Sequence, residues 1–353
     1  MIALGLIVLL RSPLTIQVTP DPYSGAVEPQ LAIDSDDRVY LAFGCGDETF
    51  VSISGDDGKS FSSPIKVGAP GKLSLGMRRG PRVAAHKGTV TVTATYGAIG
   101  GGRDGDILAF RSIDHGRTWS TGVRVNDVKG SAREGLHAMA VAPDGTLACA
   151  WLDLRDKGTR LYMSTSRDGG GTWVPNTLVY ASPSGTICQC CHPSVTFDSK
   201  GRLFVMFRNA LDGNRDMYLT SSGDHRTFDS PKKLGRGTWG LDVCPMDGGM
   251  VAVGGRNEIF TMWRRQDTIF GTDGDAAETS FGTGKQPWVA VNADGIHRVW
   301  LAGREVKVKN GELPATTLAE NGSDPVIACS ASSRLTIAAW ADRGIRARIV
   351  SPK

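Results

Sequence analysis

The sequence predicts an all-β protein in which a small antiparallel sheet is repeated along the chain. Three observations support this: a turn motif that occurs four times, a strand pattern that occurs seven times, and 45 glycines among 353 residues. No long segment has the hydrophobic period of a helix, and the glycines supply many turns. Such repeats are typical of a β-propeller, in which four-stranded antiparallel blades surround an axis.

The turn motif is clearest at residues 112–119, which read Ser-Ile-Asp-His-Gly-Arg-Thr-Trp. The four copies share a serine, an aspartate two residues later, and a Ser or Thr followed by Trp or Phe. They begin at Ser54, Ser112, Ser166 and Ser222, and the last one lacks the glycine. The aspartate can accept hydrogen bonds from N–H groups of its own loop, and the glycine permits a positive φ. We therefore expect hairpin turns with an architectural role.

The strand pattern consists of a Pro, His or Gly, an apolar-x-Ala-like strand, a turn and a second apolar strand. Its copies begin at Pro29, Pro81, His137, Pro193, Gly249, Pro287 and Pro325, and examples of the partner strand are 39–43, 148–152, 203–207, 298–302 and 335–340. The spacing is that of propeller blades. We expect one domain, residues 13–353, with seven blades. Six blades are the alternative, because the last two segments are short enough to form one.

The two ends of the chain are expected to complete one blade. The last segment offers only three strands, ending at 345–350, whereas the chain opens with an unpaired strand at 14–18. Pairing these strands closes the ring and removes an exposed sheet edge. Within residues 1–12, the segment 2–10 is apolar but only about half the length needed to cross a bilayer, so no membrane span is expected. They fit the remnant of a secretory signal, or alternatively a first strand, and favour a secreted or periplasmic protein.

The turn motif resembles the Asp-box of the sialidase-like, or BNR-repeat, β-propellers, and the blade pattern extends the resemblance over most of the chain. It implies that the Asp-boxes lie at the blade rim and that function lies on the opposite face. Sialidases of this family have six blades, bind a carboxylate with three arginines, and use a Tyr nucleophile with a Glu partner. The chain also resembles bacterial exported propellers that carry a Cys-x-Cys-Cys loop with a Cys-Pro-Met-Asp-Gly-Gly stretch.

Arginines are the main candidates for ligand binding on that face. A planar guanidinium can bind both oxygens of a carboxylate and keeps its charge when partly desolvated. The ligand-binding candidates are Arg78, Arg82, Arg155, Arg208 and Arg343, and the last four together with Glu134 are the candidates for catalysis. We therefore expect an anionic small molecule or glycan as the ligand. The alternative is that these arginines form ion pairs between blades.

The tyrosines bear on whether the ligand is also hydrolysed. All six lie at or before Tyr218, so the last three segments contain none that could serve as a sialidase nucleophile. Binding is favoured, with an exo-sialidase-type glycoside hydrolase or a copper-dependent enzyme as alternatives, and a non-catalytic interaction propeller with disulfide-linked loops as another. The formal net charge is +4, and its basic residues are scattered. Nucleic acid is therefore not an expected partner.

Seven cysteines are distributed unevenly along the chain. Cys149 and Cys329 fall inside apolar strands and are predicted to be core residues. The others are expected on the functional face: Cys45, Cys188, Cys190, Cys191 and Cys244. Three cysteines within four residues, with a fourth on the next equivalent loop, can place several thiolates around one soft metal ion. This predicts a copper or zinc site at Cys188, Cys190, Cys191 and Cys244, with His192 or Met246 as auxiliary ligands.

Other interpretations of the cysteines remain open. A structural disulfide could join Cys244 to Cys190 or Cys191, or Cys188 to Cys191. A reactive cysteine could act with His192 or His137. Cys188, Cys191 and His192 also have the C-x-x-C-H spacing of a c-type haem site. The extra cysteine inside that motif and the absence of a surrounding helix argue against haem.

Overall fold

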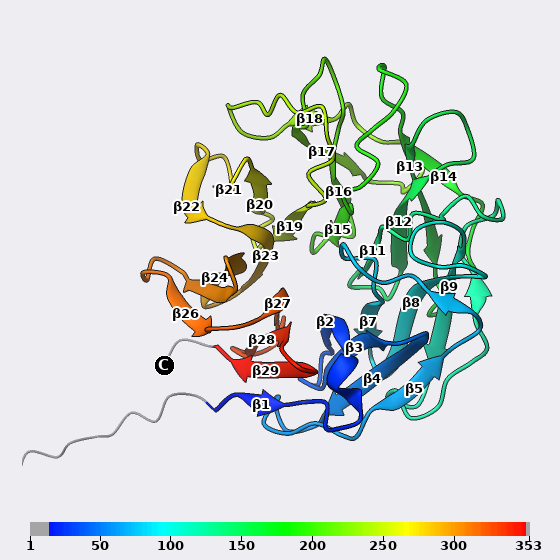
Figure 1. The fold of residues 1–353 in the computed structure, drawn as a ribbon, viewed down its shortest axis with the longest axis vertical. Coiled ribbons are helices and arrows are strands. Elements are labelled where there is room, and N and C mark those ends of the chain that lie inside the picture. The colour runs from blue at the N-terminus through cyan, green and yellow to red at the C-terminus, as the bar shows by residue number, and fades with distance from the viewer. Residues whose placement is uncertain (1–13, 351–353) are drawn as a thin grey trace, which may run out of the picture.

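The described residues, 14–350, form seven antiparallel sheets around a central axis in the computed structural model (Figure 1). The prediction of a signal remnant at residues 1–12 lies outside these residues. Within residues 14–350, the one helical element is a short 3-10 turn at Tyr23–Gly25, and no helix there is long and apolar enough to cross a membrane. The prediction of seven blades is confirmed, and the six-bladed alternative is wrong.

The first four blades follow one another along the chain. Blade 1 contains β2 (Val27–Ile33), β3 (Val39–Cys45), β4 (Glu48–Ser54) and β5 (Ile65–Gly68); blade 2 contains β7 (Arg82–His86), β8 (Thr89–Gly97), β9 (Asp106–Ser112) and β10 (Val123–Arg124); blade 3 contains β11 (His137–Val141), β12 (Leu147–Asp153), β13 (Arg160–Ser166) and β14 (Thr177–Tyr180); blade 4 contains β15 (Ser194–Phe197), β16 (Leu203–Arg208), β17 (Met217–Ser222) and β18 (Lys232–Lys233). A short strand that the sequence did not predict, β6 (Lys72–Leu73), also pairs with β8.

The last three blades complete the ring. Blade 5 contains β19 (Gly249–Val253), β20 (Ile259–Arg265), β21 (Thr268–Asp273) and β22 (Thr279–Thr283); blade 6 contains β23 (Lys285–Asn292), β24 (Gly295–Ala302), β25 (Glu305–Asn310) and β26 (Thr316–Ala319); blade 7 contains β27 (Ser323–Cys329), β28 (Thr336–Ala341), β29 (Ile345–Ile349) and the N-terminal β1 (Ile16–Gln17). The first strand of each blade contacts the first strands of both neighbouring blades, so these inner strands surround the axis.

The ring closes through the N-terminal strand, as the sequence predicts. Ile16 of β1 lies opposite Ala347 of β29 in an antiparallel pair. Beyond the strand, the Val18 N–H donates to the carbonyl of Ile345 over 2.9 Å, and the Ile345 N–H donates to Thr19 Oγ1 over 2.8 Å. Blade 7 therefore has four strands, and its outer edge is paired.

The core lies between adjacent blades. Leu41 and Phe43 of β3, for example, pack with Ile337 and Ala339 of β28, which joins blade 1 to blade 7. Because neighbouring blades cover both faces of each second strand, these strands read as continuous apolar runs. The predicted core residue Cys149 is fully buried in β12, whereas Cys329 is half-buried at the end of β27.

The four Asp-boxes follow the third strands of blades 1 to 4, at the predicted hairpins. In the copy after β9, Asp114 accepts hydrogen bonds from Ser112 Oγ at 2.7 Å and from the Thr118 N–H at 2.9 Å, and Gly116 has a φ of 82°. The aromatic Trp119 packs against a buried cluster formed by blades 1 and 2. These bonds hold the pKa of Asp114 well below its usual range. The motif therefore stabilises a hairpin.

The fourth Asp-box shows why it can lack the glycine. Its aspartate, Asp224, bonds to the N–H and hydroxyl of Thr227, three residues later instead of four. The loop is one residue shorter, and its single left-handed residue is His225, with a φ of 60°. The second left-handed position, which glycine fills in the other copies, is absent from this loop.

Candidate functional site

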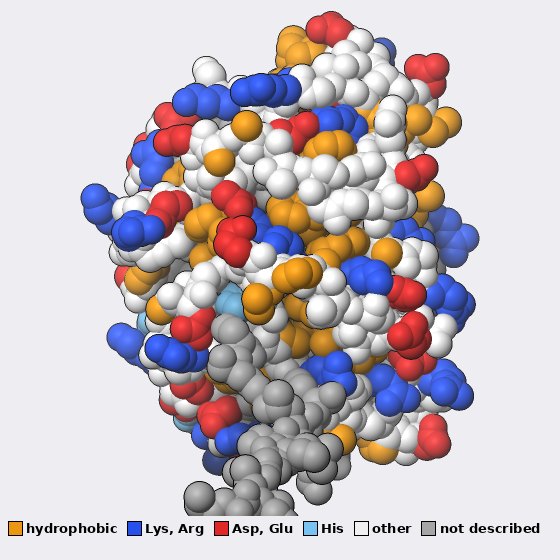
Figure 2. All heavy atoms as spheres, turned by 90° about the vertical axis from the view of Figure 1, so that its left-hand side faces the viewer, with side chains coloured by type: hydrophobic (Ala, Val, Ile, Leu, Met, Phe, Trp, Pro, Cys, Tyr) orange, Lys and Arg blue, Asp and Glu red, His pale blue; other side chains and the backbone are white. Residues whose placement is uncertain are grey.

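The predicted functional face is the end of the propeller at which the inner strands begin, and we call it the loop face. Val27, the first residue of β2, pairs with Gly44 near the end of β3, whereas Ser54 of the first Asp-box pairs with Val39 at the other end. The blade-to-blade connections therefore lie opposite the Asp-boxes. On the side of the propeller seen in Figure 2, acidic and basic side chains are interspersed.

Arg78 reaches the axis at the loop face from the turn before β7. Its side chain is buried, and its Nη2 donates to the carbonyls of Gln286 at 3.0 Å and Pro325 at 3.1 Å, at the start of the inner strands of blades 6 and 7. Its guanidinium carbon lies 5.1 Å from the centre of the Trp288 ring. The residue has a φ of 63°, a left-handed conformation that is uncommon for arginine. One side chain thus connects three blades across the axis.

Buried carboxylates surround this arginine. Glu28 is the second residue of β2, the inner strand of blade 1, and Asp247 precedes the inner strand of blade 5. Burial raises the pKa of both groups, and the neighbouring Asp324 adds to the effect at Glu28. Arg78 lies within electrostatic range of all three carboxylates. Within residues 14–350, Glu28 Oε1, Asp247 Oδ1 and the Nε and Nη1 of Arg78 are buried without a hydrogen-bond partner. We call Arg78, Glu28, Asp247 and Asp324 the axial charge cluster.

The inner strands below this cluster line a cavity of about 260 Å³. Its walls include Gln30, Val195, Met250, Trp288 and Val289. Polar side chains, among them Arg82 and Thr196, line the cavity as well.

Arg82 lies at the axis, where its guanidinium donates to main-chain carbonyls. Its Nη1 donates to the carbonyl of Gly80 at 2.7 Å, and its Nη2 donates to the carbonyl of Arg78 at 2.6 Å. Burial lowers the pKa of Arg82 to about 10. This side chain holds the turn that presents Arg78, and its contacts do not support the predicted ligand-binding or catalytic role.

Arg208 and Arg155 are likewise satisfied by the protein. Arg208 is 1% exposed and donates to the carbonyls of Arg215, Asp247 and Arg264. Arg155 pairs with Asp153 and lies 3.9 Å above the Tyr162 ring, with further bonds to Asp127 and Asn176. Arg155 is thus held by ion pairs, and Arg208 by main-chain carbonyls.

Two further candidates lie near the axis. Glu134 forms an ion pair with Arg79 at 3.7 Å, and burial raises the pKa of its carboxyl. His137 is fully buried between the Gly135 carbonyl and the Thr93 side chain, and burial lowers its pKa to about 3. This histidine is neutral and occupied by its neighbours, so it is not placed to activate a cysteine.

Arg343, by contrast, lies at a pocket of about 530 Å³ on the loop face. Its side chain is 87% exposed, and its ion pair with Asp342 spans 3.9 Å. The pocket is bounded by blades 6 and 7 and by the link between β1 and β2, and its charged or amide lining residues are Lys285, Gln286, Arg304, Asp324, Asp342 and Arg343. Of the five predicted arginines, Arg343 is therefore the most accessible to a ligand.

The pocket and the axial charge cluster are connected. Gln286 Nε2 donates to Asp324 Oδ1 at 2.9 Å, while the Asp324 N–H donates to Gln286 Oε1 at 3.1 Å. The Gln286 N–H donates to Asp247 Oδ2 at 2.8 Å, and its carbonyl accepts from Arg78. A ligand in the pocket would thus contact two residues that hold the cluster in place.

Glu28 and Gln286 are not among the residues predicted from the sequence, although the sequence contains a signal for them. Both are polar residues directly before the repeated proline of an inner strand, and Asp324 occupies the same position in blade 7. All three have left-handed φ angles, between 51° and 55°. The bulge that results turns each side chain toward its neighbours at the axis. In blades 1, 6 and 7, a polar residue directly before the repeated proline therefore indicates a side chain at the axis.

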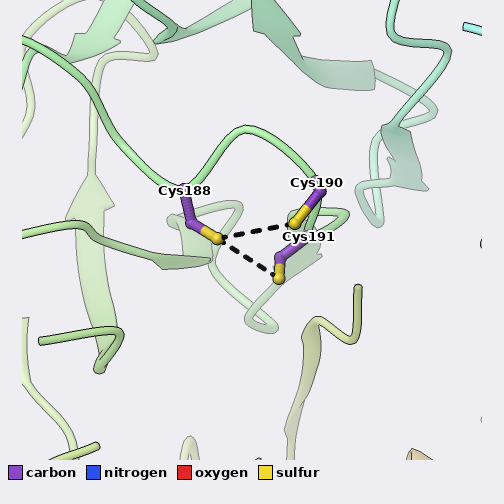
Figure 3. A group of neighbouring side chains, drawn as sticks. All are labelled: Cys188, Cys190 and Cys191. Atoms are coloured by element: carbon purple, nitrogen blue, oxygen red, sulfur yellow. Dashed lines mark hydrogen bonds between the residues drawn. The ribbon is translucent and has the colours of Figure 1, made fainter. Parts of the chain in front are cut away.

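The cysteine loop lies between blades 3 and 4, and Figure 3 shows three sulfurs turned toward one another. The sulfurs of Cys188, Cys190 and Cys191 all lie within 4.8 Å of one another. Cys188 Sγ is 3.4 Å from Cys191 Sγ and 3.9 Å from Cys190 Sγ. Cys190 is disulfide-bonded to Cys244 on the next blade-to-blade loop, with Cα atoms 6.1 Å apart. This is one of the pairings that the sequence left open.

The disulfide bears directly on the predicted site with four thiolates. In this state the sulfurs of Cys190 and Cys244 are bonded to each other, so they cannot also be thiolate ligands. His192 is buried, with its Nδ1 3.1 Å from the carbonyl of Pro193. Met246 is exposed, and Cys45 is half-buried beside the core of blades 1 and 7, away from the cluster. Two free thiols, those of Cys188 and Cys191, remain in the cluster.

These two thiols have different acidities. A hydrogen bond with Cys191 lowers the pKa of Cys188 to about 6, with smaller contributions from nearby arginines. Burial raises the pKa of Cys191 well above its usual value. Cys188 is therefore the more acidic of the two thiols.

Comparisons with known proteins agree with this architecture. Residues 78–236 match the family model described as a BNR repeat-like domain. A Penicillium chrysogenum alpha-L-arabinanase complexed with arabinobiose is 14% identical, with a TM-score of 0.59 over 96% of this chain and 98% of that one. A virginiamycin B lyase from Staphylococcus aureus is 11% identical, with a TM-score of 0.59 over 96% and 99%.

An ulvan lyase gives a similar result, with 10% identity and a TM-score of 0.57 over 93% of this chain and 94% of that one. At these identities the similarity concerns the fold. A comparison with curated proteins finds no significant match.

Proposed function

The chain is a β-propeller of the BNR-repeat type, and we propose that it binds a carboxylate-bearing sugar in the pocket between blades 6, 7 and 1. The observation that carries this proposal is the group of three cationic side chains, Lys285, Arg304 and Arg343, around one pocket on the loop face. The volume of about 530 Å³ lies within the range of small-molecule sites. One or two sugar rings fit such a volume.

The charges in the pocket favour an acidic sugar over a neutral one. Asp342 is paired with Arg346 at 3.0 Å, and Asp324 accepts from Gln286, so both pocket carboxylates already have partners. Among residues 14–350, the one ion pair of Arg343 is its long contact with Asp342. A ligand carboxylate would therefore find a guanidinium available, and hydroxyl groups could bond to the polar side chains around it.

We favour binding without hydrolysis. Residues 219–353, which include blades 5 and 6 and the last three strands, contain no tyrosine that could serve as a sialidase-type nucleophile. Tyr23, in the link between β1 and β2, packs against the buried cluster of blades 1 and 7. The solved structures with this fold include an arabinanase with arabinobiose and an ulvan lyase, which supports a carbohydrate as the ligand class. A purified sample should leave a fluorogenic sialoside intact.

The test is titration calorimetry with acidic oligosaccharides chosen from a glycan array, with neutral counterparts of equal length. Arg343→Gln and Lys285→Gln should each weaken binding about tenfold or more, since a hydrogen bond to a charged group contributes about 1.5–3 kcal/mol. Arg117→Gln, an exposed site on the Asp-box face, is the matched control. Equal affinity for acidic and neutral sugars, or unchanged affinity in both variants, would contradict the proposal.

A second candidate function concerns the cysteines in their reduced state. We propose that Cys188, Cys190 and Cys191 then hold a soft metal ion such as Cu(I) or Zn(II), with Cys244 as a fourth ligand. The mutual proximity of the three sulfurs supports this, because soft ions prefer thiolates. Reduced protein should take up one equivalent of metal by elemental analysis, and oxidised protein or Cys190→Ser should take up less. Equal uptake by all three samples would refute this candidate; Cys149→Ser is the control.

A further inference from the structure

We propose that the four cysteines on the two loops that flank blade 4 form a thiol–disulfide exchange site, in which the buried Cys188–Cys191 dithiol exchanges with the disulfide between Cys190 and Cys244. This inference is independent of the carbohydrate proposal. It rests on where the four sulfurs lie and on which of them solvent can reach.

In each of the two steps, the attacking sulfur lies close to the sulfur that it attacks. Cys188 Sγ lies 3.9 Å from Cys190 Sγ, which is one half of the disulfide. Cys191 Sγ lies 3.4 Å from Cys188 Sγ, on the same short loop. Exchange proceeds when a thiolate attacks a disulfide sulfur, so neighbouring sulfurs are the first requirement. Figure 3 shows Cys188 directed toward both partners.

The exchange balances without any external reagent. The Cys188 thiolate attacks Cys190 Sγ, a Cys188–Cys190 bond forms, and Cys244 leaves as a thiolate. Cys191 then loses its proton to Cys244 and attacks Cys188 Sγ, so that a Cys188–Cys191 bond forms and Cys190 leaves as a thiolate. One disulfide and two reduced sulfurs are present before and after. The net change moves the disulfide inward and the reduced pair outward.

The rearrangement moves a reduced sulfur from a buried position to an exposed one. Cys188 and Cys191 are 0% and 1% exposed, so an outside reagent cannot reach them in the folded protein. Cys244 is exposed, and Val243 and Met246 beside it are 65% and 53% exposed. After exchange, the reactive thiol therefore lies on the surface next to two apolar side chains. The same step releases the Cys244 loop from the cysteine loop of blade 4.

The experiment traps Cys244 in the native protein. Protein purified without reductant is incubated with N-ethylmaleimide and a chelator, then acidified and digested with trypsin. One tryptic peptide, 168–200, contains Cys188, Cys190 and Cys191, and another, 237–256, contains Cys244. Before exchange the two peptides are linked. After exchange, peptide 237–256 appears alone with one maleimide, and peptide 168–200 carries one internal disulfide and one maleimide.

The variants separate exchange from simple exposure. Cys188→Ser should keep the two peptides linked throughout. Cys191→Ser should still release peptide 237–256 with one maleimide, but should leave a Cys188–Cys190 disulfide in peptide 168–200. Cys149→Ser, which changes a buried cysteine in blade 3, should release peptide 237–256 as fast as the wild type. Two results would overturn the proposal: peptides that stay linked in the wild type, or maleimide on Cys188 or Cys191 while the link persists. The chelator removes metal from the assay, so the outcome does not depend on the metal proposal.

Discussion

Replacement of Arg208 by alanine separates a structural arginine from a ligand-binding one. Its guanidinium donates to three main-chain carbonyls, those of Arg215, Asp247 and Arg264, and it lies 5.3 Å from the centre of the Trp239 ring. These carbonyls belong to blades 4 and 5 and to the loop that carries Cys244. The buried side chain therefore links blade 4 to blade 5.

The expected loss of stability follows from these contacts. Hydrogen bonds to a charged group contribute about 1.5–3 kcal/mol each, and three carbonyls would lose such a donor. Allowing for incomplete additivity, the free energy of unfolding should fall by at least about 4 kcal/mol. In a large domain this lowers the melting temperature by roughly 8 °C or more. Arg208→Lys should lie between, because an ammonium cannot reach three carbonyls in one plane.

The assay is thermal unfolding followed by circular dichroism, with Arg343→Ala as the matched control. Arg343 is exposed, so its loss should change stability by no more than about 0.5 kcal/mol. The affinity for carbohydrate, by contrast, should fall in Arg343→Ala. An Arg208→Ala protein that melts within about a degree of the wild type would refute the structural assignment. Arg208 would then be available again as a ligand-binding residue.

The fold was predictable because its signals are local. Each inner strand begins with the same short pattern, and each second strand is a continuous apolar run, since blades cover both of its faces. The pairing of residues 14–18 with the last blade followed from counting strands. The additional strand β6 was not predictable, because two residues, Lys72 and Leu73, carry no periodicity.

The site was less predictable because it depends on main-chain groups. The sequence shows that Arg208 follows an apolar strand, but not that the carbonyls of Asp247 and Arg264 converge on it from the next blade. Arg343 looks equivalent in the sequence, yet its side chain is 87% exposed in the structure. The disulfide has a similar origin: Cys190 and Cys191 are adjacent in sequence, and only the course of the loop decides which one meets Cys244.

Three further predictions concern stability. Thr19→Val should destabilise the protein by about 1–3 kcal/mol in urea unfolding, because the buried Ile345 N–H loses its acceptor, whereas Thr19→Ser should keep most of it. Gly116→Ala should lower the melting temperature, since the position has a φ of 82° and the new Cβ would lie 2.9 Å from Ile53; an unchanged melt would show that the Asp-box loop can relax. The third prediction concerns the melting temperature at low pH. Hydrogen bonds from Ser60 and Ser54 lower the pKa of Asp56 to about 2, below the unfolded value of about 3.9. A carboxyl whose pKa is depressed by folding stabilises the native state above its unfolded pKa, and this stabilisation is lost as the pH falls toward the folded pKa. The difference in melting temperature between wild type and Asp56→Ala should therefore be full at pH 6 and shrink between about pH 4 and pH 2. Asp57→Ala, at the exposed neighbouring position, should show no such trend, and a difference that stays constant down to pH 2 would mean that the Asp56 charge does not stabilise the hairpin.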